Sequence, residues 1–331
     1  MVVSVKLEAP LGTSLKSLVK GYLLTHQTQG SSPNTVEYCW GILNRFLWYA
    51  EKRNWPEDAR LLTEWHIREF LGYVGTETKR WDKEGNGSES SSHKASPRTV
   101  HHYYSVLRAF FNWAVKEDFI AESPVAKVRL PRPQQKVIRP YTEEQIRRML
   151  QVCDHDCQHN AKFLGSRNKA IILILLDSGL RVSELANIKL ADIDTARGWI
   201  KVVGKGCKER VIRIGIVAQK SLWRYLMYRG ENDRQELWLS EESRPLQTSG
   251  IQSAVDRLKK RAGINEEGCV HRCRHTFALS FLRADRNPFN LQYLLGHSSL
   301  EMVRHYTATL GMEDALKAHE KAIPVDLLGV K

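Results

Sequence analysis

The sequence predicts a mainly α protein with two domains: an all-helical N-terminal domain and a mixed α+β C-terminal domain with a small β-hairpin. The chain of 331 residues is long enough for two domains of ordinary size, each burying its own core. From about Ser14 to Trp113, apolar residues recur at helical spacing. Further along, GWIKVVG and KERVIRIG are short, rich in β-branched residues and joined by a tight turn through Gly204, Lys205 and Gly206, which is typical of a hairpin.

Four amphipathic segments form the predicted N-terminal domain, residues 1–123. The first carries Leu15, Leu18, Val19 and Leu23 on one face. The other three begin at N-cap residues or early prolines: Ser31 or Ser32 with Pro33, Thr63, and Ser96 with Pro97. Because strand-like patterns are scarce in this part of the sequence, we expect the four helices to pack into a compact all-helical domain.

The connection between the third and fourth helices, TETKRWDKEGNGSESSSHKAS, is polar and rich in glycine and serine. It is longer than most connections in compact domains. Two interpretations of residues 77–96 stay open. The simpler one is a tolerated surface insertion, and the other is a segment that becomes ordered on a partner.

Residues 124–140 are predicted to form a basic, proline-rich linker between the domains. The segment has no acidic residue, and its prolines favour an extended backbone. Such a strap would lay positive charge along a phosphate backbone, although a solvated linker without a ligand could have the same composition. Its place between two domains favours contact with nucleic acid. The basic residues are Lys127, Arg129, Arg132, Lys136 and Arg139.

The C-terminal domain is predicted to span residues 141–331. Thr142 and Gln145 form a capping box that opens a helix. A mostly apolar helix through SRNKAIILILLDSG is expected to be buried and to end at Gly179. SLWRYLMYRG and SGIQSAVDRLKKRAGI are expected to be supporting helices, and a short amphipathic helix is expected at about residues 311–323.

One stretch of this domain, from Cys269 to Tyr306, contains groups that suit chemistry on a phosphodiester. These are His271, Arg274, His297 and Tyr306. A guanidinium can pair bidentately with phosphate oxygens, an imidazole can transfer a proton, and a phenol can act as a nucleophile. Since His271 and Arg274 are three residues apart, a helix through HRCRHTFALSFLRA would project both side chains from one face.

The charge balance of the chain favours a nucleic-acid partner. Lys and Arg number 50 against 37 Asp and Glu, which gives a net charge of +13. An excess of this size favours a polyanion, and a membrane surface is the weaker alternative because no basic amphipathic helix stands apart from the rest. No apolar run approaches the roughly 20 residues that cross a bilayer, and the N-terminus lacks the apolar region of a signal peptide. A cytoplasmic protein is therefore expected.

Six cysteines in 331 residues are too few for a disulfide scaffold and suit a reducing compartment. Two clusters invite a zinc interpretation: CDHDCQH from Cys153 to His159, and the alternating Cys269, His271, Cys273 and His275. Neither has the C-x2-C spacing of a structural zinc site. A helix through the second cluster would also place alternate residues on different faces, so no metal site is expected.

Three sequence segments together resemble the signature boxes of one family. HRCRH, LLGHSSLEMVRHY and LLDSGLRVSELANIKLADID are similar to those of the tyrosine recombinases, the phage-integrase and Xer-type site-specific DNA recombinases. The resemblance runs from about Thr142 to the C-terminus, and the N-terminal part resembles the family in pattern and composition alone. It implies a helical core-binding domain that clamps DNA, followed by a catalytic domain.

The resemblance also implies a set of site residues. By position in the boxes, the catalytic residues are Arg181, Lys205, His271, Arg274, His297 and Tyr306, with Glu184 in a supporting position. Without the resemblance, Lys205 would be an ordinary turn lysine, and Lys208 is the alternative for its role. In the family, His297 would donate a hydrogen bond to the phosphate. Neither a metal, a nucleotide nor another cofactor is expected, in agreement with the absence of a G-x4-G-K-[ST] sequence.

The implied reaction is strand cleavage by a tyrosine. Tyr306 would attack the scissile phosphate, form a 3′-phosphotyrosyl intermediate and release a 5′-hydroxyl. His271 would act as the acid/base, while Arg181 and Arg274 would clamp the non-bridging oxygens and Lys205 would protonate the leaving oxygen. The implied function is integration or excision of a mobile element, or Xer-like resolution. Two alternatives stay open: a type IB topoisomerase, which typically has Lys in place of His271, and a catalytically inactive DNA-binding protein.

The partners implied are double-stranded DNA with a specific inverted-repeat core site and further copies of this chain. A tetramer on DNA is expected, with the helix at 311–323 exchanged between neighbouring subunits; folding back onto its own domain is the simpler alternative. Basic, aromatic and polar side chains on the second and fourth helices could reach phosphates or a major groove. These candidates are Thr35, Tyr38, Arg45, Arg98, His101, His102, Tyr104 and Arg108.

Overall fold

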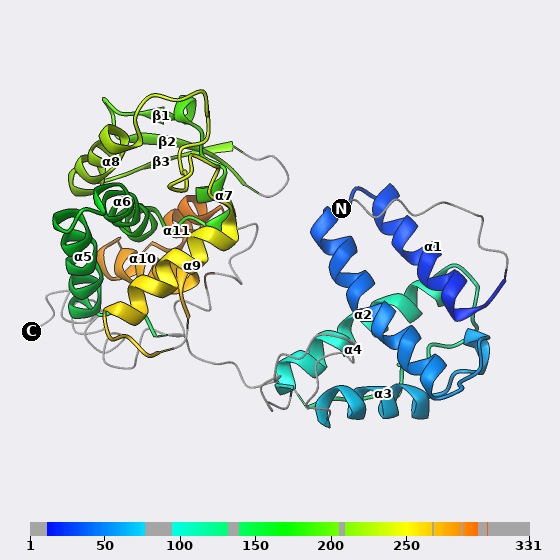
Figure 1. Ribbon diagram of the computed structural model, residues 1–331. Coiled ribbons are helices and arrows are strands. Elements are labelled where there is room, and N and C mark those ends of the chain that lie inside the picture. The colour runs from blue at the N-terminus through cyan, green and yellow to red at the C-terminus, as the bar shows by residue number, and fades with distance from the viewer. Residues whose placement is uncertain are drawn as a thin grey trace, which may run out of the picture. The chain divides into compact units, whose positions relative to one another are not determined.

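The computed structural model describes residues 12–76, 95–131, 139–204, 209–266, 268–285, 287–296 and 303 (Figure 1). The chain divides into two compact units, Met1–Gln135 and Lys136–Lys331. Several sequence predictions lie outside the described residues: the segment 77–94, Arg132, Lys136, Lys205, Lys208, His297, Tyr306 and the helix at 311–323.

The first unit consists of the four predicted helices and a short 3-10 helix, Ala59–Leu61. Their bounds are α1 (Leu15–Thr28), α2 (Pro33–Lys52), α3 (Glu64–Thr76) and α4 (Pro97–Lys116). Ser14, Ser32 and Ser96 are the N-caps of α1, α2 and α4, and each side chain accepts a hydrogen bond from the backbone N–H three residues further on. The caps and early prolines seen in the sequence therefore fix where these helices begin.

Aromatic residues pack edge-on within the mostly aliphatic core of the first unit. Phe46 is fully buried and meets Phe70 and Phe111 edge-on, with ring centroids 5.0 and 6.0 Å apart. Val125 and Val128 belong to the same core, and the hydroxyl of Tyr104 donates to the carbonyl oxygen of Val128 at 3.0 Å. The expectation of an extended strap is therefore wrong for residues 124–128, where a turn buries two valines against the helices.

The second unit combines seven helices with a three-stranded antiparallel sheet in the order β1-β2-β3, as far as its residues are described. The strands are β1 (Ile193–Asp194), β2 (Trp199–Val203) and β3 (Glu209–Arg213), and Figure 1 shows them at one end of the unit beside α8. The helices are α5 (Glu143–Gln158), α6 (Lys162–Ser178), α7 (Val182–Ala186), α8 (Ile216–Arg229), α9 (Thr248–Arg261), α10 (Val270–Asp285) and α11 (Pro288–Leu295). The predicted hairpin strands correspond to β2 and β3, and β1 was not predicted.

Helix α6 forms the centre of the second unit, in contact with α5, α8, α9 and α10. Ile171, Ile172 and Leu175 are fully buried in it. The helix ends at Gly179, whose φ of 61° places it in the left-handed region that favours glycine. The predicted capping box of α5 is also present, with reciprocal hydrogen bonds of 3.2 Å between Thr142 and Gln145.

A buried arginine ties the start of the second unit to α10. The guanidinium of Arg272 donates to the carbonyl oxygens of Arg139, at 2.8 Å, and of Pro140, at 3.2 Å. It also lies over the ring of Tyr141, 4.2 Å from the ring centroid. The backbone N–H of Tyr141 in turn donates to the hydroxyl of Thr276 on α10.

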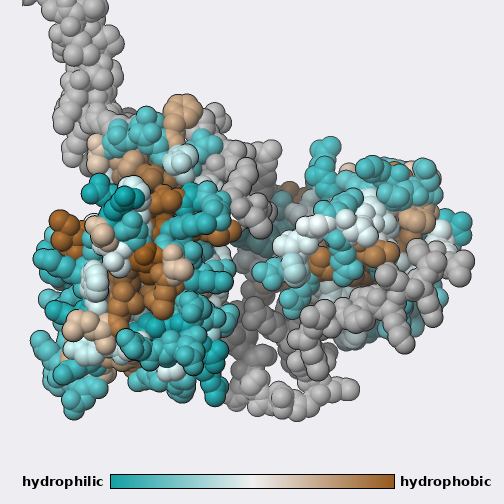
Figure 2. Space-filling model, turned by 90° about the horizontal axis from the view of Figure 1, so that it is seen from above, coloured by the Kyte–Doolittle hydropathy of each residue, from teal (hydrophilic) through white to brown (hydrophobic). Residues whose placement is uncertain are grey.

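Part of the surface of the second unit is apolar. Figure 2 views this unit from the side of the sheet and α8 and shows apolar surface between hydrophilic side chains. Helix α8 exposes a set of large apolar side chains: Ile216, Val217, Trp223, Met227 and Tyr228. Among the described residues, no helix is both long enough and apolar enough to span a membrane.

The contact between α5 and α6 depends on a glycine. A Cβ atom at Gly165 would lie 2.6 Å from the carbonyl oxygen of Cys153 and 2.8 Å from the backbone nitrogen of Cys157. Gly165→Ala is therefore expected to destabilise the second unit by about 1–3 kcal/mol, because backbone atoms must move apart. Hydrogen exchange measured by mass spectrometry should show faster exchange in peptides from α5 and α6.

Gly41→Ala is the matched control for this substitution. Gly41 is an exposed position inside α2, and a Cβ atom there meets nothing within 4 Å. Alanine should stabilise α2 by about 0.5–1 kcal/mol, since glycine loses more backbone freedom on folding. Unchanged exchange in α5 and α6 of Gly165→Ala would show that the two helices tolerate a wider spacing.

Candidate active site

Helix α10 carries the first two candidate residues, His271 and Arg274. Arg274 is 4% exposed, and its guanidinium donates to the carbonyl oxygens of Gly179 and of Leu295, the latter at 2.9 Å. These two carbonyls belong to the ends of α6 and α11. The guanidinium is thus held in a fixed position by backbone groups from two other helices.

Arg181 reaches the same place from a different element. It follows Gly179 and the fully buried Leu180, and it is the N-cap of α7. Its Nη1 donates to the carbonyl oxygen of Leu295 at 3.5 Å and to Oε1 of Glu184 at 3.0 Å. Arg181 and Arg274 therefore converge on one carbonyl oxygen. The side chain of Arg181 is 33% exposed, so a solvent-borne group can reach it.

Glu184 is the buried acid of this cluster, with its side chain 4% exposed. Its carboxylate accepts hydrogen bonds from the backbone N–H and Nη1 of Arg181, at 2.9 and 3.0 Å. It also accepts two from Arg210, at 3.0 and 2.9 Å. Burial alone would raise the pKa of Glu184, but these hydrogen bonds and the two positive charges outweigh burial and hold the pKa below its ordinary value. The carboxylate is therefore ionised at neutral pH.

Arg210 was not among the predicted site residues. It lies on β3, and its side chain is 9% exposed. In addition to its two bonds to Glu184, its Nε donates to the carbonyl oxygen of Leu294 at 3.0 Å. The sequence held one signal for it: in the alternating strand ERVIR, Arg210 shares a face with the buried Ile212, and a buried arginine requires an acidic partner.

The electrostatics of the cluster favour a neutral imidazole at His271. The side chain lies at the surface of α10, but the protein around part of its ring excludes water and lowers the pKa of His271. The positive charges of Arg274 and Arg181 lower this pKa further, because they disfavour a third cation nearby. A neutral imidazole can accept a proton, as a general base must.

The described residues also include the immediate sequence neighbours of the other candidates. Gly296, which precedes His297, ends α11 with a φ of 62°. Val303 is 1% exposed and packs in a small core with Ala278, Leu282 and Leu295. Lys205, His297 and Tyr306 themselves lie outside the described residues, so the structure brings together Arg181, Glu184, His271 and Arg274.

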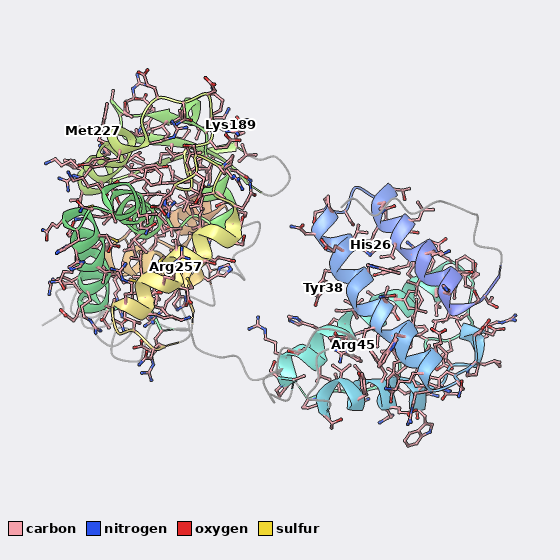
Figure 3. All side chains as sticks on the ribbon, viewed as in Figure 1. His26, Tyr38, Arg45, Lys189, Met227 and Arg257 are labelled. Atoms are coloured by element: carbon pink, nitrogen blue, oxygen red, sulfur yellow. The ribbon has the colours of Figure 1, made fainter. Side chains whose placement is uncertain are left out.

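In the first unit, Arg45 is the candidate DNA contact that the structure places differently from expectation. It is 8% exposed, its Nη1 donates to the hydroxyl of Tyr103 at 3.1 Å, and its guanidinium lies over the rings of Tyr73 and Tyr103. Its position inside the unit favours a structural role over contact with DNA. Tyr38, on the same helix (Figure 3), is 48% exposed and meets the ring of His102 on α4.

Most other candidate DNA contacts are accessible. His101 and Tyr104 are partly buried. Those with exposed side chains are Thr35, Arg98, His102, Arg108, Lys127, Arg129 and Arg139.

The two clusters considered for zinc lie on α5 and α10 or directly next to these helices. Cys153 and Cys273 are fully buried, and the rings of His155 and His159 stack with centroids 3.9 Å apart. Within the described ranges, no group of three or more His, Cys, Asp or Glu side chains is placed to hold a metal ion.

Comparisons with known proteins identify the family of this chain. The model of the phage integrase family matches residues 140–311. Tyrosine recombinase XerC of Oceanobacillus iheyensis is 30% identical over 304 residues, which cover 89% of this chain and 92% of that protein.

Two solved structures share the fold. XerH recombinase bound to a palindromic difH substrate has a TM-score of 0.66 at 21% identity, over 95% of this chain and 85% of that one. A lambda integrase tetramer bound to a Holliday junction has a TM-score of 0.64 at 20% identity, over 86% and 78%.

These findings define an enzyme that cuts and transfers DNA strands. The chain belongs to the phage integrase family of tyrosine recombinases, and its activity is site-specific DNA recombination. The alternatives of a type IB topoisomerase and an inactive DNA-binding protein gain no support from these matches.

Proposed function

We propose that this recombinase cleaves DNA through a 3′-phosphotyrosyl link to Tyr306, with Arg181 and Arg274 holding the scissile phosphate. The observation that carries the proposal is the convergence of both guanidiniums on the carbonyl oxygen of Leu295. Two fixed guanidiniums can offer parallel N–H donors to the non-bridging oxygens and stabilise the charge of the pentavalent transition state. Because the donors are already in place, little reorganisation is required during the reaction.

The remaining roles follow from chemistry and chain connectivity. His271, neutral because its pKa is lowered, accepts the proton of the attacking phenol. Lys205 protonates the leaving 5′-oxygen, and His297 donates a hydrogen bond to the phosphate. Val303, three residues before Tyr306, is buried in the same small core as Leu295. Because three extended residues span at most about 11 Å, we propose that Tyr306 reaches the arginine pair from this core.

The DNA partner is double-stranded, with a specific inverted-repeat core site bound by several copies of the chain. The net charge of +13 and the exposed basic residues of the first unit support a DNA partner, because cationic side chains bind the phosphates of any DNA sequence. We propose that residues 1–123, with the turn at 124–128 packed against them, form the core-binding domain, that residues 141–331 form the catalytic domain, and that the rest of the segment 124–140 joins them. The solved lambda integrase assembly supports a tetramer, in which we propose that the segment 311–323 is exchanged between neighbours. The process is integration and excision of a mobile element or Xer-like resolution, in the cytoplasm.

Covalent trapping on DNA tests this proposal. The protein is incubated with fragmented DNA in excess chelator, detergent-resistant adducts are recovered, and the attached sites are sequenced. A nicked suicide duplex built from such a site should give an adduct joined through the 3′-phosphate and a free 5′-hydroxyl that a kinase labels without prior phosphatase treatment. Adducts at 5′ ends, or a strict requirement for a divalent metal, would contradict the mechanism. Site-independent relaxation of a supercoiled plasmid would indicate a topoisomerase.

A further inference from the structure

Arg210 has no role in the proposed reaction, yet it is bound as tightly as the candidate active-site residues. It offers three hydrogen bonds of 2.9–3.0 Å, two to the oxygens of Glu184 and one to the carbonyl oxygen of Leu294. Its side chain is 9% exposed, whereas that of Arg181 is 33% exposed. Arg210 therefore supports the cluster from within the protein.

The arrangement of charges gives this support a specific consequence. Glu184 is one carboxylate between two guanidiniums, so the three side chains together carry a net charge of +1. Arg210 takes both carboxylate oxygens, whereas the side chain of Arg181 donates to Oε1 alone. If Arg210 lost its guanidinium, Arg181 would be the remaining cationic side-chain partner of the buried Glu184. The negative charge of Glu184 would then be balanced by Arg181 alone, because an unpaired buried charge is costly. Arg181 would then have less positive charge to offer a phosphate.

The third contact links Arg210 to the meeting point of the two arginines. It binds the carbonyl oxygen of Leu294, while Arg181 and Arg274 bind that of the next residue, Leu295. All three guanidiniums thus hold the last turn of α11, just before Gly296. Gly296 itself has little space, since a Cβ atom there would lie 3.0 Å from Nη1 of Arg210.

We propose that Arg210 is a positioning residue for Arg181 in strand cleavage: by engaging both oxygens of Glu184, it fixes the direction of the Arg181 guanidinium and leaves its charge available to the scissile phosphate. The inference rests on the proposed function insofar as Arg181 is taken to bind that phosphate. Arg210 does not touch the DNA, and its effect passes through Glu184.

The test compares cleavage of two suicide substrates in single turnover at saturating protein. One carries the ordinary phosphate at the scissile position, and the other carries a methylphosphonate, in which a neutral methyl group replaces a charged non-bridging oxygen. Arg210→Met should slow cleavage of the ordinary substrate about 10- to 100-fold through misdirection of Arg181. The neutral substrate needs less positive charge, so on it the decrease in cleavage rate caused by Arg210→Met should be at least severalfold smaller. The same should hold for Arg181→Met.

Two further variants make the result specific. Arg213→Met, an exposed position on the same strand, is the matched control and should cleave both substrates at the normal rate. Arg181→Met combined with Arg210→Met should be no slower than Arg181→Met alone, because both substitutions remove the same contribution. Arg210→Lys keeps the positive charge but lacks the paired N–H donors of the guanidinium. It replaces Arg210→Met in the experiment if the methionine variant fails to fold.

The outcomes separate this inference from the proposed function. Three results would overturn the role of Arg210. They are an equal decrease in cleavage rate on both substrates, additive decreases in the double variant, and normal cleavage by Arg210→Met. Normal cleavage by Arg181→Met would instead overturn the assignment of Arg181 as a phosphate ligand. DNA affinity, measured by fluorescence anisotropy, should stay within about threefold of normal for Arg210→Met, since the affinity of such proteins comes from many phosphate contacts.

Discussion

Tyr306→Phe is expected to abolish covalent protein–DNA adducts while DNA binding stays intact. The substitution removes one oxygen atom, and that oxygen forms the bond to phosphorus in the proposed mechanism. An unperturbed phenol has a pKa of about 10, so the attack also requires a proton acceptor or nearby positive charge, which His271, Arg181 and Arg274 can supply. A nicked suicide duplex analysed by denaturing electrophoresis measures the adduct, and gel shift measures binding.

Tyr293→Phe is a suitable control for this experiment. Tyr293 is 74% exposed on α11, in the same region of the sequence, and has no role in the mechanism. It should form adducts at the normal rate. Adducts that survive in Tyr306→Phe would refute the assignment of the nucleophile, and loss in both variants would point to damage in the fold.

Arg274→Lys is expected to slow strand cleavage about 10²- to 10³-fold, the usual cost of removing one preorganised donor to a charged transition state. Lysine keeps the positive charge but lacks the planar fork, so it cannot donate to Gly179, Leu295 and a phosphate oxygen together. Single-turnover cleavage at saturating protein measures the effect without a contribution from binding.

Because Arg274 is buried, part of its effect could come from lost stability. Arg167→Lys provides the comparison: Arg167 is 3% exposed and donates to the carbonyl oxygen of Leu239 at 2.7 Å, outside the candidate site. Both variants should unfold at lower temperature than the wild type, and Arg274→Lys alone should lose cleavage. Similar losses of cleavage in both variants would contradict a specific role for Arg274.

Several helices of this protein were predictable because their ends are encoded locally. Ser32 and Ser96 precede prolines, Thr142 and Gln145 form a capping box, and Gly179 occupies a left-handed position. The strand β1 was missed because it has two residues, and its pairing with Trp199 and Ile200 depends on β2. The turn at residues 124–128 was missed for a similar reason, since the proline-rich composition hid two valines that the helical core buries.

Within the site, the sequence boxes implied that Arg181 and Arg274 act together, but the carbonyl oxygen of Leu295 that both bind is visible only in the folded structure. Sequence alone does not separate accessible arginines from buried ones: it predicts Arg45 as a DNA contact, whereas the structure packs Arg45 against Tyr73 and Tyr103. The same difficulty concealed Arg210, whose partner Glu184 is 26 residues away along the chain. A buried ion pair between distant residues has no local pattern, and the folded arrangement of α7 and β3 is needed to reveal it.

The clamp formed by Arg272 has a mechanical consequence. Its guanidinium holds the carbonyl oxygens of Arg139 and Pro140 while its own backbone belongs to α10, between His271 and Arg274. A displacement of the chain at Arg139 would therefore be passed to the turn of α10 that carries His271, the proposed acid/base. We expect a load applied to the segment entering the second unit to shift this turn.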